Sequence, residues 1–125
     1  MRELRPHHRD EAAFVSRVDE AQRPQGYRLV GAFEDGRVVA VAGFRVLENL
    51  AWGRALYVDD LSTHAAARRR GHAVRLLEWC AEEAARLGCD ELHLDSGVGP
   101  EREDAHRLYF NQRLRISSFH FATRL

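Results

Sequence analysis

The sequence predicts an α/β fold in which a mixed central sheet is flanked by helices. Two apolar segments meet at Asp35-Gly36, a dipeptide that favours a tight turn between antiparallel strands. A helical pattern over residues 67–87 separates two strand-like segments, 54–62 and 91–95. Because a crossover helix joins parallel strands, these two segments should run parallel and lie side by side.

The first predicted element is a helix over residues 10–22, in which apolar residues recur at helical spacing. Pro24 and Gly26 end it. A pair of helices broken at Pro6 is the alternative interpretation. Residues 1–6 are too short and too charged to form a convincing strand, so an N-terminal strand is expected to be missing or shortened.

Three strands are predicted next, over residues 27–33, 37–46 and 54–62. The second contains the almost wholly apolar run 38–42, which suggests a strand that is covered on both faces. Residues 48–53 connect the second strand to the third. The three strands should form an antiparallel meander.

The second half of the chain continues with the helix over 67–87, which Gly88 ends. The alternating segment 91–95 is a short strand. Residues 102–112 have helical character, and residues 116–122 are predicted to close the chain as a strand.

Length and composition indicate one domain over residues 1–125, since 14.3 kDa suffices for a single core. Nineteen basic residues balance nineteen acidic ones, which argues against a general binder of nucleic acid or of anionic membranes. No apolar run approaches the roughly 18 residues of a membrane span, and the N-terminus lacks the apolar region of a signal peptide. We therefore expect a cytoplasmic protein.

The spacing of the cysteines and histidines indicates no metal site. Cys80 and Cys89 fit no zinc-ribbon or zinc-finger pattern, and both are expected to be reduced. His93, His106 and His120 likewise match no ligand spacing.

The segment Leu56–Leu77 carries the strongest functional signal in the chain. It reads as a strand, a loop with Arg68–Arg70 and Gly71, and the start of a helix. The first N–H groups of a helix have no partner within it, and the macrodipole adds partial positive charge there. The pattern therefore indicates a phosphate-binding junction. A solvated basic helix end is the alternative interpretation.

The order of motifs from residue 27 onward resembles the GNAT superfamily of acyl-CoA-dependent N-acetyltransferases. Residues 68–73, RRRGHA, are similar to the family motif Gln/Arg-x-x-Gly-x-Gly/Ala. The segment 91–95 resembles the strand after that helix, residues 105–109 the family's Ala-x-x-x-Tyr segment, and residues 116–121 its closing strand. The resemblance implies a central sheet of about six strands and acetyl-CoA as cosubstrate.

The resemblance also assigns residues to the site. It implies that acetyl-CoA is bound by two groups of residues: Leu61, Ser62 and Thr63 at the pantetheine arm, and Arg68, Arg69, Arg70, Gly71, His72 and Ala73 at the pyrophosphate. The His72 side chain must then point away from the phosphates. Tyr109 is implied to donate a proton to the departing thiolate. In the family's Tyr-x-x-x-Gly-Phe ending this chain lacks the glycine, and Asn111 is a residue at which it could turn instead.

Asp59 and Asp60 are the candidates for the general base, with Asp95 a similar one. Neighbouring strand residues face opposite ways, so at most one of the first two is expected to serve directly. Each has an ordinary structural role as its alternative.

These observations predict a small N-acetyltransferase that moves an acetyl group from acetyl-CoA to a primary amine in a ternary complex. The main alternative is a non-catalytic acyl-CoA-binding module that has lost its acceptor site. A nucleic-acid-binding domain that uses the arginine cluster is a third possibility, which net neutrality disfavours.

The acceptor's identity is weakly encoded in the sequence. Acidic residues suggest a cationic amine, although a solvated surface explains them equally well: Asp19, Glu20, Glu48 and residues 101–104. An exposed sheet edge suggests a homodimer.

Overall fold

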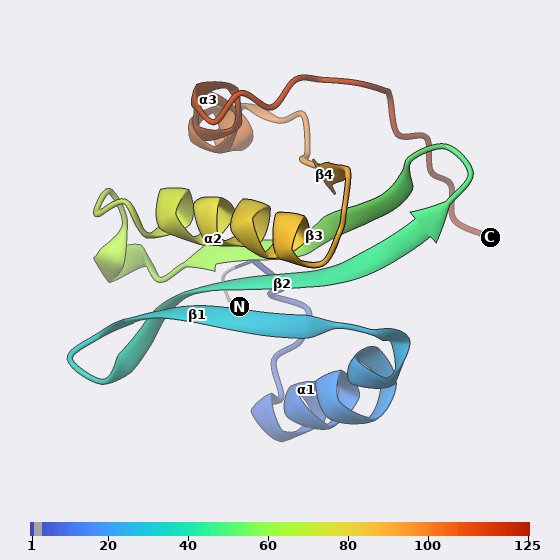
Figure 1. Cartoon of the computed structure of the whole chain (residues 1–125). Coiled ribbons are helices and arrows are strands. Elements are labelled where there is room, and N and C mark those ends of the chain that lie inside the picture. The colour runs from blue at the N-terminus through green and yellow to red at the C-terminus, as the bar shows by residue number, and fades with distance from the viewer. Residues whose placement is uncertain (2–3) are drawn as a thin grey trace. The chain divides into compact units, whose positions relative to one another are not determined.

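The computed structural model describes residue 1 and residues 4–125, which form two compact units, 1–94 and 95–125 (Figure 1). The helices and strands of the first unit are α1 (Glu11–Arg17), β1 (Arg28–Glu34), β2 (Arg37–Asn49), β3 (Gly53–Thr63), α2 (His72–Arg86) and β4 (Glu91–Leu94). The second unit contains α3 (Glu103–Asn111).

The N-terminal helix forms where the periodicity predicts it. Asp10 caps α1 by accepting a hydrogen bond from the Ala13 N–H at 3.1 Å. The helix continues as a wider π-type turn, Val18–Gln22, and a 3₁₀ turn, Arg23–Gln25. Within the described residues β1 is the first strand, in agreement with the missing N-terminal strand that the sequence predicts.

The sheet has the order β1-β2-β3-β4. The first three strands are antiparallel and β3 and β4 are parallel, as predicted. Asp35 and Gly36 both adopt positive φ, 49° and 77°, which is the conformation of a tight two-residue hairpin turn. This turn sets the pairing of β1 with β2.

α2 covers one face of the sheet, whereas α1 lies on the other side (Figure 1). The core between α2 and the sheet is formed by buried residues of β2, β3 and α2: Ala40, Ala42, Phe44, Leu56, Val58, Leu76, Cys80 and Ala84. The prediction that residues 38–42 are covered on both faces was wrong. Val38 is 50% exposed, whereas Ala40 and Ala42 are buried in the core against α2.

α2 begins at His72, later than the predicted start near residue 67. Ala65–Ala67 form a separate 3₁₀ turn. Arg69 and Gly71 have φ values of 64° and 80°, which no right-handed helix accommodates. The four residues 68–71 therefore form a loop between β3 and the helix.

In the second unit, α3 confirms the helix predicted over 102–112. The strand predicted over 116–122 was wrong: no described residue after Asn111 lies in a strand. Strands need a backbone partner, and no other strand lies among residues 95–125. The apolar side chains of Ile116, Phe119 and Phe121 are exposed there. The sheet of the described residues thus has four strands rather than about six.

The described part of the chain contains no helix that combines the length and apolar character needed to cross a membrane. Cys80 and Cys89 are both free thiols. Burial raises the pKa of the Cys80 thiol to about 11, which makes it unreactive near neutral pH. We find no group of three or more metal-ligating side chains among the residues described.

Candidate functional site

A β-bulge in β3 places two acidic side chains on the same face of the sheet. The pairing steps from Val58 to Asp60 on β3 while β2 advances by one residue, which leaves Asp59 as the extra residue. Val58 and Leu61 both pack toward the α2 core. Asp59 and Asp60 therefore both face away from α2, and the expectation that they point in opposite directions was wrong. Simple alternation fails at the inserted residue.

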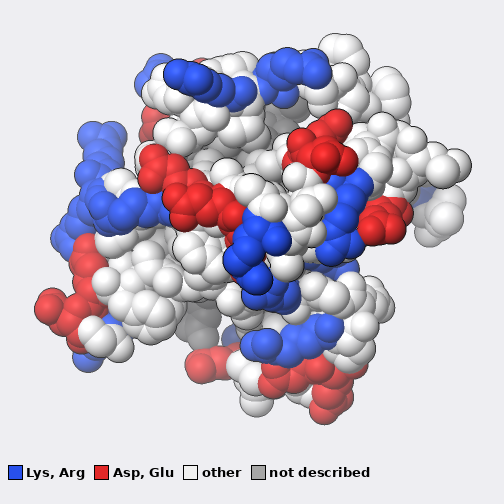
Figure 2. Space-filling view, viewed as in Figure 1, with Lys and Arg blue, Asp and Glu red and all other residues white. Residues whose placement is uncertain are grey.

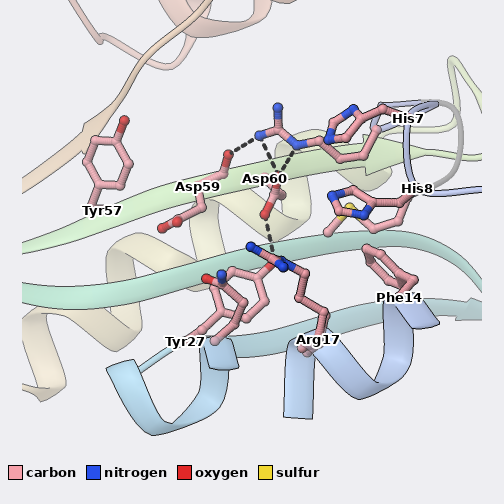
Figure 3. A pocket seen from close by; sticks show the side chains of 12 residues that line it. His7, His8, Phe14, Arg17, Tyr27, Tyr57, Asp59 and Asp60 are labelled. Carbon is pink, nitrogen blue, oxygen red and sulfur yellow. Dashed lines mark hydrogen bonds and ion pairs between the residues drawn. The ribbon is translucent and has the colours of Figure 1, made fainter. Parts of the chain in front are cut away.

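The two aspartates line a pocket of about 360 Å³ on this face (Figure 3). Its other walls come from separate parts of the first unit. Phe14 and Arg17 belong to α1, and Tyr27 precedes β1. His7 and His8 close another side from the N-terminal segment (Figure 3).

Asp60 is held by two partners inside this pocket. Its carboxylate accepts hydrogen bonds from Arg5 Nε at 2.7 Å and from the Tyr27 hydroxyl at 2.7 Å. Burial, together with the Asp60 carboxylate, raises the pKa of Tyr27, so its phenol stays protonated and acts as a donor. The Tyr27 ring lies over Gly43, where any Cβ would stand 1.7 Å from its hydroxyl oxygen.

Asp59 is paired with a different arginine from the one that contacts Asp60. Arg45 Nε and Nη2 donate to its two carboxylate oxygens at 3.1 Å and 2.8 Å, a bidentate pair. The Arg45 guanidinium also lies 5.5 Å from the centre of the Tyr27 ring. Each carboxylate of the pocket is thus matched by one arginine.

A second feature lies between the end of β3 and α2. Gly71 is the N-cap of α2, and no side chain caps this end of the helix. The first helical hydrogen bond is donated by the Arg75 N–H to the Gly71 carbonyl at 3.1 Å. The N–H groups of His72, Ala73 and Val74 precede it and have no acceptor within the helix. This end of α2 is therefore suited to an anion.

Arginines surround this helix end. Arg68, Arg69, Arg70 and Arg75 are all exposed, and Figure 2 shows basic side chains gathered at this side of the molecule. Arg70 is also anchored: its Nη1 lies 2.5 Å from Glu34 Oε2 at the end of β1. Arg75 Nη2 donates to the Arg70 carbonyl at 3.2 Å. The loop combines positive charge with a fixed backbone.

His72 is buried, with 6% of its surface exposed, and points to Glu34 rather than toward the open side of the loop. Its Nδ1 lies 3.0 Å from Arg75 Nη2, and an arginine only donates, so Nδ1 is the acceptor. Nε2 therefore carries the proton and donates to Glu34 Oε1 at 2.7 Å. This hydrogen bond, followed by the charge of Arg70, lowers the pKa of Glu34.

β3 runs between the two aspartates and the arginine loop, and among the described residues part of one of its edges has no neighbouring strand. β4 pairs with β3 over Ala55–Val58, whereas β2 continues alongside β3 as far as Thr63. Among the described residues, Leu61, Ser62 and Thr63 have no strand on the β4 side. An extended ligand arm could hydrogen-bond to their backbone at that edge. The edge leads from the aspartates to the arginine loop.

Tyr109 lies in α3 of the second unit and is half-buried. Burial raises the pKa of its phenol, while the Arg102 guanidinium acts in the opposite direction. The hydroxyl is thus protonated at neutral pH. Asp95 also belongs to the second unit and lies 3.8 Å from His120.

Sequence reasoning missed Arg5, Tyr27 and Arg45 as partners of the aspartates. One signal was present: Gly43 interrupts an apolar strand, and an isolated strand glycine indicates close approach of another group. Nothing in the local pattern indicates that this group is a tyrosine 16 positions earlier, since only the tertiary fold brings it there.

Residues 1–113 match the sequence profile described as the Acetyltransferase (GNAT) family. A relative from Bacillus subtilis (strain 168), "Uncharacterized N-acetyltransferase YhdJ", is 29% identical over 100 residues, which cover 80% of this chain and 69% of that protein.

Solved structures show the same fold. An aminoglycoside acetyltransferase, HMB0005, from an uncultured soil metagenomic sample is 26% identical, with a TM-score of 0.76, over 95% of this chain and 77% of its own. AAC(6')-Iy, solved with a bisubstrate analogue of CoA, has a TM-score of 0.80 at 17% identity, over 99% of this chain and 85% of its own. At that identity the likeness concerns the fold alone.

Proposed function

This chain belongs to the acetyltransferase (GNAT) family, and on that premise we propose that it transfers an acetyl group from acetyl-CoA to a primary amine by direct attack in a ternary complex. The observation that carries this proposal is the uncapped, arginine-rich start of α2 at the end of β3. It offers an anion site beside a strand edge that could hold an extended arm.

The residues of this region fit acetyl-CoA. We assign the pyrophosphate to the loop 68–73, where backbone N–H groups and exposed arginines meet. Leu61, Ser62 and Thr63 would hold the pantetheine arm at the open edge of β3. His72 leaves this space free because its side chain turns toward Glu34. When bound, acetyl-CoA supplies the activated acetyl thioester.

The acceptor site in this proposal is the pocket over Asp59 and Asp60. The attacking amine must be neutral, and a carboxylate can accept the proton that it loses. We favour Asp59 for this role, because its side chain is 23% exposed against 12% for Asp60. Asp60 then fixes Arg5 and Tyr27 in the pocket wall.

We propose Tyr109 as the donor of the proton that the CoA thiolate takes up. Its segment resembles the family's Ala-x-x-x-Tyr, and the raised pKa keeps its hydroxyl protonated. This role implies that residues 1–125 work as a single acetyltransferase domain. The family match supports that view, since it runs over residues 1–113 and so spans both units.

The test is a free-thiol assay with acetyl-CoA and a panel of primary amines, with N-acetyl products identified by mass spectrometry. We expect amine-dependent thiol release by the wild type. Tyr109→Phe should lower kcat by about 100-fold or more with little change in the KM for acetyl-CoA. Thiol release that no amine stimulates would contradict the proposed transfer.

A further inference from the structure

We propose that the acceptor is an amine that carries a carboxylate next to an apolar group, as a hydrophobic amino acid does, and that Arg17 binds this carboxylate. The inference rests on the proposed function, because it concerns the pocket over Asp59 and Asp60. It names the chemistry by which that pocket selects its amine.

Among the described residues, the two carboxylates that line the pocket are each paired with an arginine. Asp60 is paired with Arg5 at 2.6 Å, and Asp59 with Arg45 at 2.8 Å. Each carboxylate is therefore balanced by a guanidinium within contact distance. A substrate with several ammonium groups would meet carboxylates that are already neutralised.

Arg17 lines the pocket from α1, and it has no hydrogen bond or ion pair with any residue that the structure describes. In Figure 3 its side chain extends from α1 across the pocket. A guanidinium without a partner at the wall of a cavity is a site for a carboxylate, which it can bind through two parallel hydrogen bonds.

Several of the other side chains that line the pocket are aromatic or aliphatic. Phe14 packs edge-on against His8, with ring centres 5.5 Å apart, and both side chains line the pocket. Tyr27, Tyr57 and Val18 add further aromatic and aliphatic surface. A small ligand in this cavity of about 360 Å³ could place an apolar group against these side chains.

Two of the acidic residues that suggest a cationic acceptor in the sequence, Asp19 and Glu48, are not among the side chains that line this pocket. Asp19 is paired with Arg23 at 2.8 Å on the outside of the N-terminal helix. Glu48 is paired with Arg54 at 2.8 Å near the β2–β3 turn. Both carboxylates are therefore part of the solvated surface, which is the alternative explanation of these acidic residues given in the sequence analysis.

Matched acceptors test the inference. The value of kcat/KM, calculated for the unprotonated amine, is measured for four acceptors: L-phenylalanine, L-phenylalanine amide, 2-phenylethylamine and the polycation spermidine. We expect wild type to prefer L-phenylalanine by about tenfold or more over the other three. Arg17→Gln should abolish that preference, while the control Arg9→Gln, at an exposed arginine outside the pocket, should keep it.

A binding measurement separates this inference from the proposed function. Calorimetric titration of L-phenylalanine and 2-phenylethylamine into the CoA-saturated protein needs no turnover. Binding of L-phenylalanine that requires Arg17 supports the inference even if the thiol assay fails. It is overturned by equal binding of the two amines, by binding of neither, by preference for spermidine, or by an unchanged preference in Arg17→Gln.

Discussion

At the scale of single residues, the absence of a side chain at Gly43 decides how the pocket is built. The Tyr27 ring occupies the space that a Cβ would need, and its hydroxyl reaches Asp60 from there. Tyr27 is itself 5% exposed, so it cannot swing into solvent without uncovering its ring. The glycine thus fixes both the tyrosine and one carboxylate.

We predict that Gly43→Ala destabilises the protein by about 3 kcal/mol, because the methyl group displaces a packed ring and breaks a charge-assisted hydrogen bond. Urea unfolding measures the change. Gly97→Ala is the control: a Cβ there would contact Arg102 at an ordinary 3.5 Å. Equal stability of the two variants would contradict the assigned role of Gly43.

Glu34 offers a second prediction, on the arginine loop. It holds both His72 and Arg70, and so ties the loop to the β1–β2 hairpin. Glu34→Gln should raise the KM for acetyl-CoA by about fivefold, since it removes the ion pair that anchors Arg70, and should leave the kcat at saturation unchanged. Glu48→Gln, which removes a surface pair with Arg54, should change neither. An equal effect in both variants would refute a specific role for Glu34.

At this scale the sequence predicts the charged residues of the candidate site but not the residues that pair with them. The arginines at 68–70 and the aspartates at 59 and 60 are visible because they cluster along the chain. Their partners Glu34, Arg5 and Tyr27 lie 33 to 55 positions away. Contacts at such separations depend on sheet register and on the bulge, which local patterns do not encode.

At the scale of elements, the left-handed turn at the end of α3 lies at a different residue from the one that the sequence suggests. The chain turns at Arg113, with φ of 66°, and not at Asn111. The Arg113 and Leu114 N–H groups donate to the carbonyls of Phe110 and Tyr109, each at 3.0 Å. These two hydrogen bonds form a Schellman motif, whose left-handed residue is normally glycine.

We therefore predict that Arg113→Gly stabilises the protein by about 1 kcal/mol, because it relieves a left-handed arginine. Thermal and urea unfolding both report the change. Arg115→Gly is the comparison, at an exposed residue without positive φ, and should be neutral or slightly destabilising. A destabilising effect of Arg113→Gly would rule out the strain assigned to this turn.

Elements whose boundaries are set by local chemistry were predicted well. The hairpin at Asp35-Gly36 and the crossover from β3 to β4 both follow from short-range signals. The start of α2 and the strand over 116–122 were misplaced. The first depends on two backbone conformations in the loop, and the second on a strand partner that residues 95–125 lack.

At the scale of the whole molecule, two buried or bridging glutamates link stability to pH. A hydrogen bond from Arg86, followed by the charge of Arg28, lowers the pKa of Glu83. In the same way, the hydrogen bond with His72 and the charge of Arg70 lower the pKa of Glu34. A carboxyl whose pKa is lower in the folded state stabilises the protein above its unfolded pKa, near 4.3. That contribution is lost as the pH falls through the folded value.

The corresponding prediction concerns the variant Glu34→Gln/Glu83→Gln. Its urea midpoint should lie below that of wild type at pH 7, and the gap should narrow as the pH falls from about 5 toward 3. Tyr27 and Asp60 remain intact in this variant, so the pocket serves as an internal control. A gap that stays constant over this range would contradict the linkage.

The central claim is that the loop 68–73 binds acetyl-CoA, and calorimetric titration of acetyl-CoA tests it most directly. Ala73→Glu places a carboxylate at the proposed pyrophosphate site. An acidic residue in the first turn favours the helix, so this variant should stay folded. Ala73→Gln matches it in size without the charge. We predict tight binding by wild type and Ala73→Gln, and at least about tenfold weaker binding by folded Ala73→Glu. Equal affinity of all three proteins, or no binding by wild type, would contradict it.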